Sequence, residues 1–190
     1  MINFLWMYTR SLKKEECEQI IDHCIKNYHP EIASIGGNGP ETIISSYRSC
    51  SLRRIDYSDH EIVRKIVFYI LDSNSYNFKF NINYLLDEEL NFLDYNKTDQ
   101  DKYDWHEDYV FFEEKNTCRK LTCIIQLTDK NDYEGCDLEF FKSGKTVKSH
   151  ELREQGTVII FPSFVPHRIT PITKGTRHSL VSWWSGPAFK

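Results

Sequence analysis

Residue types that commonly bind metal ions gather at His106-Glu107-Asp108, within the stretch KYDWHEDYVFF (102–112). Successive side chains of a β-strand point to opposite faces, so on a strand His106 and Asp108 lie on one side and Glu107 on the other. An imidazole and a carboxylate placed in this way supply two adjacent ligands for a divalent cation. We therefore expect a metal site on this strand, with Glu107 in solvent.

A third ligand is predicted at His167, directly after GTVIIFPSFVP (156–166). Gly156 opens this apolar stretch and two prolines, Pro162 and Pro166, close it, since proline cannot donate to a β-ladder. We expect a buried strand with His167 at its end. A His-x-Asp pair alone is common by chance. Together with a second histidine it forms the two-histidine, one-carboxylate triad, which is diagnostic for non-haem Fe(II) oxygen chemistry.

A cation follows ten residues later, at Arg177, and strengthens this interpretation. A co-substrate that chelates iron through one end needs its far carboxylate held by a fork of donors, which arginine supplies better than lysine. The stretch RHSLVSWW (177–184) alternates, so Arg177, Ser179, Val181 and Trp183 are expected to share one face, with Trp183 at the back of the pocket. Between the two strands we expect a crossover, with a turn at Lys174-Gly175.

Taken together, His106-x-Asp108, His167 and Arg177 resemble the pattern of the 2-oxoglutarate/Fe(II)-dependent dioxygenases, in particular the prolyl-4-hydroxylase-like branch. The supporting stretches lie in the same order as in that branch: LTCIIQLTDKNDYEGCDLEFF, GTVIIFP and PHRITPITKGTRHSLVSWW. The resemblance extends over about residues 80–187. For the residues before 80, only the arrangement of helices is similar.

The resemblance implies a site and a reaction. His106, Asp108 and His167 would bind Fe(II), and Arg177 would pair with the distal carboxylate of 2-oxoglutarate. Three further residues are candidate co-substrate contacts: Tyr95, Ser179 and Gln126. The family's reaction converts 2-oxoglutarate and O2 to succinate and CO2 while hydroxylating an unactivated C–H bond, with ascorbate as an accessory reductant. The expected substrate is a prolyl residue of a peptide or protein; a free amino acid or another small molecule is the alternative.

The elements that must position these residues are predicted from hydrophobic periodicity. Apolar residues recur at helical spacing in 11–28, with Ser11 as N-cap, and again after the Ser58/Glu61 capping box in a stripe from Ile62 to Leu71. From residue 78 the period changes to two, and the predicted strands follow one another at short intervals: FKFNINYL (78–85), LNFLDY (90–95), KLTCIIQLT (120–128), DLEFF (137–141), GTVIIF (156–161) and RHSLVSWW (177–184). A further short strand is predicted within YRSCSLRRI (47–55).

This order of elements predicts a mainly β (α+β) fold, a jelly roll or barrel with helices on one sheet. The resemblance specifies it as a double-stranded β-helix, cupin-like core. We expect one domain over residues 1–190, with a helical N-terminal support (1–77) and a β-helix core (78–187). The Gly- and Ser-rich loop 34–46 and Arg48 are candidates for a substrate lid. Among the aromatic residues around the first ligand, Tyr103 is expected nearest the pocket, with Trp105 and Tyr109 pointing away.

The composition of the chain argues against some classes of binding partner. The net charge of −4 gives no general reason to expect nucleic-acid binding. No apolar run approaches the roughly 20 residues that cross a bilayer, so no membrane partner is expected. The N-terminus lacks the features of a signal peptide, and none of the six cysteines forms a Cys-x-x-Cys pair. We therefore expect reduced, buried thiols in a cytoplasmic protein.

Two other functions fit part of the pattern. A non-catalytic metal-binding module of the same fold would be expected to have lost at least one of the four site residues, and all four are present. A zinc hydrolase would also use three ligands with an open position. However, no general base is evident for it, and Arg177 would have no role there.

Overall fold

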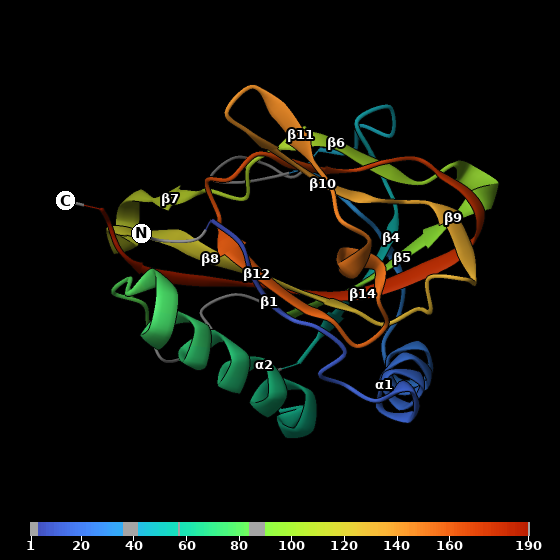
Figure 1. Ribbon diagram of the computed structural model, residues 1–190, viewed down its shortest axis with the longest axis horizontal. Coiled ribbons are helices and arrows are strands. Elements are labelled where there is room, and N and C mark those ends of the chain that lie inside the picture. The colour runs from blue at the N-terminus through green and yellow to red at the C-terminus, as the bar shows by residue number, and fades with distance from the viewer. Residues whose placement is uncertain (1–3, 36–41, 57, 84–89, 190) are drawn as a thin grey trace.

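Two antiparallel β-sheets face each other, and two helices cover the outer side of the larger sheet (Figure 1). The computed structural model describes residues 4–35, 42–56, 58–83 and 90–189. This architecture confirms the predicted mainly β, jelly-roll class with helices on one sheet. Within the described residues no helix combines the length and apolar character needed to cross a membrane.

The larger sheet has nine strands in the described part of the chain. Its main path runs through β1 (Trp6–Tyr8), β12 (Val158–Pro162), β8 (Thr117–Gln126), β14 (Ile172–Pro187), β5 (Leu90–Asn96), β4 (Ser51–Ile55) and β2 (Glu31–Ile32). Off this path, β7 (Phe111–Phe112) pairs with β8, and β9 (Tyr133–Gly135) pairs with β14.

The smaller sheet contains five described strands. Their order is β11 (Lys145–Val147), β10 (Leu138–Lys142), β13 (His167–Ile169), β6 (Lys102–His106) and β3 (Arg48–Ser49). The predicted strand 47–55 is therefore two strands, which separate at Cys50 and enter different sheets. The part of the chain expected to be a helical support thus also contributes strands to both sheets.

Residues on the two faces of the larger sheet enter two separate clusters. On the outer face, Leu180 and Trp184 of β14 pack with Ile66 and Ile70 of the second helix. On the inner face, Val181 joins a cluster with residues of the smaller sheet, such as Phe140. Fully burying side chains of this size stabilises the fold by about 1.5–3 kcal/mol each. The alternation along β14 therefore assigns one face to the helices and the other to the space between the sheets.

Both helices lie where periodicity predicts them, but each begins at a different residue from the one predicted. Helix α1 spans Lys14–Asn27, so the predicted N-cap Ser11 is wrong. Leu12 is buried, and its N–H donates to the carbonyl of Gly156, which ties the chain to the sheet before the helix begins. The carboxylate of Glu16 instead accepts from the N–H of Lys13, at 2.9 Å.

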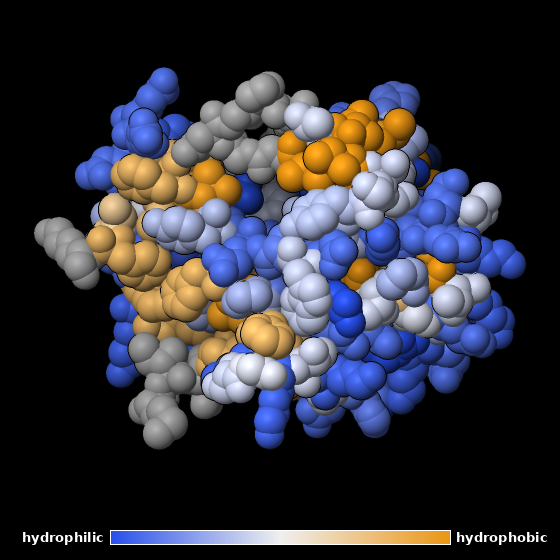
Figure 2. Space-filling model, turned by 90° about the horizontal axis from the view of Figure 1, so that it is seen from above, coloured by the Kyte–Doolittle hydropathy of each residue, from blue (hydrophilic) through white to orange (hydrophobic). Residues whose placement is uncertain are grey.

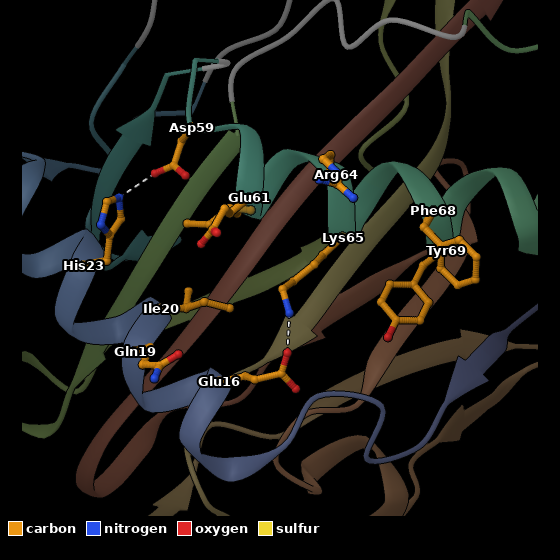
Figure 3. A pocket seen from close by; sticks show the side chains of 11 residues that line it. Glu16, Gln19, Ile20, His23, Asp59, Glu61, Arg64, Lys65, Phe68 and Tyr69 are labelled. Carbon is orange, nitrogen blue, oxygen red and sulfur yellow. Dashed lines mark hydrogen bonds and ion pairs between the residues drawn. The ribbon is translucent and has the colours of Figure 1, made fainter.

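Helix α2 spans His60–Ser73 with Asp59 as its N-cap, so the Ser58 cap is also wrong. The N–H of Ser58 donates to the side chain of Asp56, which places Ser58 in the preceding turn. An ion pair between Lys65 and Glu16 links the two helices, and they border a groove of about 680 Å³ (Figure 3). This groove lies on the helical side of the larger sheet, away from the predicted metal ligands.

The predicted strand 78–85 is wrong over the residues that the structure describes. A π-helical turn, Asn74–Phe78, continues α2, and Lys79 has a left-handed backbone conformation. The side chain of Asn74 both donates to the carbonyl of Phe80 and accepts from its N–H, each at 2.9 Å. These two bonds occupy the carbonyl and the N–H of Phe80, which in a strand would pair with a neighbouring strand. Residues 84 and 85 lie outside the described part, as do residues 36–41 of the predicted lid.

All six cysteines are free and buried, as predicted: Cys17, Cys24, Cys50, Cys118, Cys123 and Cys136. A cytoplasmic location stays a prediction.

Candidate metal centre

The two predicted histidine ligands face each other across two neighbouring strands of the smaller sheet. His106 ends β6 and His167 begins β13, and the two residues are register partners. Their ring centroids lie 4.2 Å apart. The prediction that His167 ends a strand is wrong, because the chain turns after Pro162 at the end of β12 and starts a new strand at His167.

The predicted carboxylate ligand lies just beyond the end of β6 rather than on it. The backbone N–H of Asp108 donates to the carbonyl of Ser163 at 2.9 Å, in the turn that leads to His167. This bond brings the Asp108 side chain next to both imidazoles. Glu107 is exposed, as predicted.

One group of potential ligand atoms suited to a metal ion occurs among the described residues, and it consists of His106, Asp108 and His167. Their ligand atoms all lie within 4.8 Å of one another. The Nε2 atom of His106 is 3.7 Å from Oδ1 of Asp108, and Nε2 of His167 is 3.4 Å from Oδ2. The three side chains are almost completely buried. Residues far apart in the sequence therefore converge into one two-histidine, one-carboxylate cluster.

Hydrogen bonds hold each of these side chains in an orientation suited to a metal. Nδ1 of His106 donates to the carbonyl of Asp104 at 2.7 Å, and Nδ1 of His167 donates to that of Val165 at 2.9 Å. Both Nε2 atoms then keep their lone pairs for a ligand role. The hydroxyl of Thr122 donates to Oδ2 of Asp108 at 2.9 Å.

Sequence reasoning missed Thr122. It lies on β8, two residues before Ile124 and four before Gln126, so alternation along this strand places Thr122 on the inner face with both of them.

Burial and mutual charge set the protonation states that metal binding needs. Burial, helped by the nearby His167, lowers the pKa of His106 to about 4. Burial would raise the pKa of Asp108, but the imidazoles of His167 and His106 and the guanidinium of Arg119 outweigh this and lower it. At neutral pH the cluster therefore presents a neutral His106 and an ionised carboxylate.

A buried cation lies in the same cavity. Arg177, on β14, is only 2% exposed, and its Nε donates to Oε1 of Gln126 at 2.9 Å. Its Nη1 has no hydrogen-bond partner among the described residues, and neither has the Oγ of Ser179. Buried polar atoms are nearly always paired, so these donors are suited to a ligand with acceptor oxygens. A dicarboxylate with one end at the triad and the other at Arg177 has the required chemistry.

The predicted co-substrate contacts fall into two groups. Tyr95 and Ser179 line the cavity together with the triad, and the Cζ of Arg177 lies 5.6 Å from the Tyr95 ring centroid. The structure places Gln126 behind Arg177 instead, because its amide donates to Thr128 and Tyr133 while its oxygen accepts from Arg177.

The walls of the cavity also follow the predicted alternation. Arg177, Ser179, Val181 and Trp183 line it along one face of β14. Tyr103 stacks on His106 with the ring centroids 3.4 Å apart. Arg48, a candidate for the substrate lid, lies in the cavity wall. The segment Lys174-Gly175, expected as a turn, lies within β14: the register against β9 shifts between Ile172 and Lys174, Gly175 adopts a positive φ, and the strand continues.

A jelly roll with this triad and a buried arginine in one cavity defines the class of non-haem Fe(II) oxygenases that use 2-oxoglutarate. Comparison with known proteins agrees. Residues 90–185 match the 2OG-Fe(II) oxygenase superfamily, and the chain belongs to this family. The family and the triad imply Fe(II) and 2-oxoglutarate as cofactor and co-substrate.

Relatives at the sequence level include PKHD-type hydroxylases. One from Synechococcus sp. (strain CC9605) is 34% identical over 83 residues, which are 44% of this chain and 36% of the relative. One from Colwellia psychrerythraea is 36% identical over 63 residues, 33% of this chain and 27% of the relative. The match thus spans about a third of the length of these curated relatives.

Solved structures show the same fold over almost the whole chain. A prolyl-4-hydroxylase from Pseudomonas putida superposes with a TM-score of 0.72 at 17% identity and covers 97% of this chain and 94% of its own. The viral collagen prolyl hydroxylase of Paramecium bursaria Chlorella virus-1 has a TM-score of 0.69 at 16% identity, with 97% of each chain covered.

Proposed function

We propose that this chain is a 2-oxoglutarate- and O2-dependent hydroxylase that acts on a prolyl residue of a peptide or protein. The observation that carries the proposal is the convergence of His106, Asp108 and His167 in one cavity with the buried Arg177. The prolyl substrate is supported by the names of the structural neighbours, prolyl hydroxylases that share this fold. The names of the sequence relatives support hydroxylation more generally.

When bound, Fe(II) supplies the activation of O2, which couples oxidation of 2-oxoglutarate to succinate and CO2 with hydroxylation of the substrate C–H bond. The two histidines and Asp108 would hold the metal, and three protein ligands leave it free to bind further groups. Arg177 and Ser179 would hold the distal carboxylate of 2-oxoglutarate. Ascorbate would serve to keep the metal reduced.

The remaining cavity residues orient these groups and keep the site dry. Thr122 donates to Oδ2 of Asp108, the oxygen nearer His167, and this hydrogen bond restricts the rotation of the carboxylate beside the two histidines. Leu93, Ile124 and Val181 are buried residues that line the cavity and restrict access of water. Exclusion of water strengthens the charge-assisted bonds to Arg177 and protects a reactive site from side reactions.

The binding half of the proposal is tested under anaerobic conditions. Adding Fe(II) and then 2-oxoglutarate to metal-free protein should produce a metal-to-ligand charge-transfer absorption band. The band should be lost in Asp108→Ala and should need far more 2-oxoglutarate in Arg177→Ala. Glu107→Gln is the matched control, because Glu107 is the exposed neighbour of Asp108, and it should retain the band.

The catalytic half is tested in air. The protein with Fe(II), ascorbate and 2-oxoglutarate should form succinate, and mass spectrometry of a library of proline-containing peptides should find a product with one added oxygen on proline. Metal binding without succinate formation under any of these conditions would contradict catalysis and favour a non-catalytic metal-binding module. An added oxygen on another residue, or only on free proline, would contradict the prolyl-peptide assignment and leave the oxygenase assignment intact.

A further inference from the structure

A second cleft adjoins the cavity that holds the triad. This cleft, of about 470 Å³, shares Asp108, Tyr103, Trp183 and Arg48 with the triad cavity, so it adjoins the place where a substrate must reach the metal. The molecule is seen from the side of the smaller sheet in Figure 2, where apolar surface gathers in two areas separated by polar side chains. The cleft itself is lined by charged residues such as Arg119 and by aromatic residues such as Phe111, so a substrate that reaches the triad through it meets both kinds of group.

Arg48 occupies the boundary between the two cavities. It lies on β3 opposite Tyr103 of β6, and its Cζ is 4.6 Å from the centroid of the Tyr103 ring. Tyr103 in turn stacks on the ligand His106. The guanidinium of Arg48 is therefore separated from a triad histidine by a single aromatic side chain.

One hydrogen bond to the backbone holds the guanidinium of Arg48, and a buried donor of the same group is left unused. Its Nη1 donates to the carbonyl of Ser34 at 2.8 Å. Its Nε is buried and has no hydrogen-bond partner among the described residues. A buried donor of a charged group needs an acceptor, and a carboxylate is the acceptor that a guanidinium binds best.

The cleft carries an excess of positive charge. Besides Arg48 it is lined by Arg54 and Arg119. Arg119 lies with its Cζ 4.2 Å from the centroid of the Trp183 ring, and Arg54 pairs with Glu31 at 3.2 Å. Of the two acidic side chains that line the cleft, Asp108 belongs to the triad and Glu107 is exposed. Three guanidiniums thus border the approach to the triad.

The co-substrate does not account for this charge. 2-Oxoglutarate has two carboxylates, of which one is expected at the metal and the other at Arg177. Arg48 is then an additional cation, and a neutral C–H bond needs no cation for its recognition. The positive charge is suited to a substrate that carries an acidic group at some distance from the C–H bond that is hydroxylated.

We propose that Arg48 is a specificity-determining residue that binds a carboxylate of the substrate. This inference rests on the proposed function, because it concerns the substrate of the same site. The carboxylate belongs either to an Asp or Glu residue near the oxidised proline of a peptide or to the α-carboxylate of a free amino acid. In both cases substrates that lack the carboxylate are disfavoured.

The experiment compares probes that differ only by one carboxylate. Proline-containing peptides with Glu or Gln at each position beside the proline form one set, and L-proline with L-prolinamide forms the other. For wild-type protein the kcat/KM of succinate formation should be about tenfold higher with the acidic member of at least one pair. A tenfold ratio corresponds to a free-energy difference of about 1.4 kcal/mol. This preference should weaken as salt concentration rises, because salt screens the attraction.

Arg48→Gln should abolish the preference, because KM for the acidic member should rise to about that for the neutral one. Arg54→Gln is the matched control, since it removes a half-buried arginine of the same cleft that is already paired with Glu31, and it should retain the preference. A separate measurement, the anisotropy of fluorescently labelled Glu and Gln peptides added to metal-free protein, should show the same loss of discrimination in Arg48→Gln.

The outcomes separate this inference from the proposed function. If wild-type protein shows no charge-transfer band, the proposed function fails. If the band forms but no acidic probe is favoured in turnover or binding, only the role of Arg48 is overturned. It is also overturned if Arg48→Gln raises KM for 2-oxoglutarate and leaves the preference unchanged, since Arg48 would then contact the co-substrate. A preference within the peptide set alone assigns the carboxylate to an acidic side chain, and one within the proline set alone to a free amino acid.

Discussion

Nε of Arg177 donates to Oε1 of Gln126 at 2.9 Å, and this bond lies behind the cavity that the triad borders. The amide of Gln126 is held in turn by donation to the carbonyl of Thr128 and the hydroxyl of Tyr133. Because both its oxygen and its nitrogen are hydrogen-bonded, the buried amide of Gln126 is restricted to one arrangement. Gln126 therefore determines where the guanidinium of Arg177 lies without reaching the cavity itself.

From this network we predict that Gln126→Leu weakens 2-oxoglutarate binding. Arg177 would lose the acceptor that orients it, so the dissociation constant for 2-oxoglutarate, measured by titration of the charge-transfer band, should rise about tenfold. The free energy of unfolding should fall by about 1–3 kcal/mol, because a buried charged donor is left unpaired. Gln155→Leu, which also removes a glutamine bonded to a carbonyl, is the control and should leave the dissociation constant unchanged. Unchanged affinity in Gln126→Leu would show that Arg177 is oriented by other contacts.

A second prediction concerns the hydroxyl that holds Asp108. Thr122→Val keeps the shape of the side chain but removes the hydrogen bond to Oδ2 of Asp108. Loss of such an orienting partner typically lowers metal affinity about 10–100-fold. Competition for Fe(II) with a coloured chelator measures the effect. Thr170→Val is the control. It removes a hydroxyl that accepts a hydrogen bond from the backbone N–H of Asp137, and it should bind Fe(II) with the affinity of the wild type. If the two variants bind Fe(II) with equal affinity, Thr122 does not contribute to metal binding.

The stability of the metal-free protein should depend on pH through His106. Its pKa of about 4 in the folded protein lies below the unperturbed value of 6.5. Between these pH values the unfolded chain binds a proton that the folded protein excludes. The free energy of unfolding is therefore constant with respect to this group above about pH 6.5 and falls as the pH is lowered towards 4, by at most about 3 kcal/mol.

Urea unfolding of metal-free protein at several pH values between 4 and 7 tests this dependence. His106→Gln should show a smaller decline than the wild type, whereas the variant of an exposed histidine, His150→Gln, should decline as the wild type does. The same slope in His106→Gln and wild type would contradict the assigned shift. Because His178 also has a lowered pKa on burial, part of the decline should remain in His106→Gln.

Two glycines provide a test of the strand that carries Arg177. Gly175 has a φ of 72°, and a Cβ added there would lie 2.0 Å from the backbone oxygen of Asp132. Gly144 has a φ of 77° but nothing within 4 Å of an added Cβ. Gly144→Ala should lower the free energy of unfolding by about 1–2 kcal/mol, from backbone strain alone. Gly175→Ala should lower it by about 2–5 kcal/mol, because overpacking adds to the strain. Equal losses would mean that the backbone at Asp132 moves aside without cost in free energy.

The sequence by itself determined the kinds of residue in the site and their order along the chain. The types and spacing of His106, Asp108, His167 and Arg177 indicated the chemistry, and alternation correctly placed Ser179 and Trp183 on the face of Arg177. Local periodicity can do this because it depends on the geometry of one strand or helix at a time.

Only the tertiary structure decided which groups meet. It placed Asp108 beyond the end of its strand, Gln126 behind Arg177, and Arg48 in the cavity wall. It also replaced the strand predicted at 78–85, over its described residues, by a turn closed through the side chain of Asn74. Each of these outcomes depends on a hydrogen bond or a packing contact that periodicity does not encode, and for the site residues the partners come from elements distant in the sequence. Such contacts form only when the sheets and their connecting turns come together.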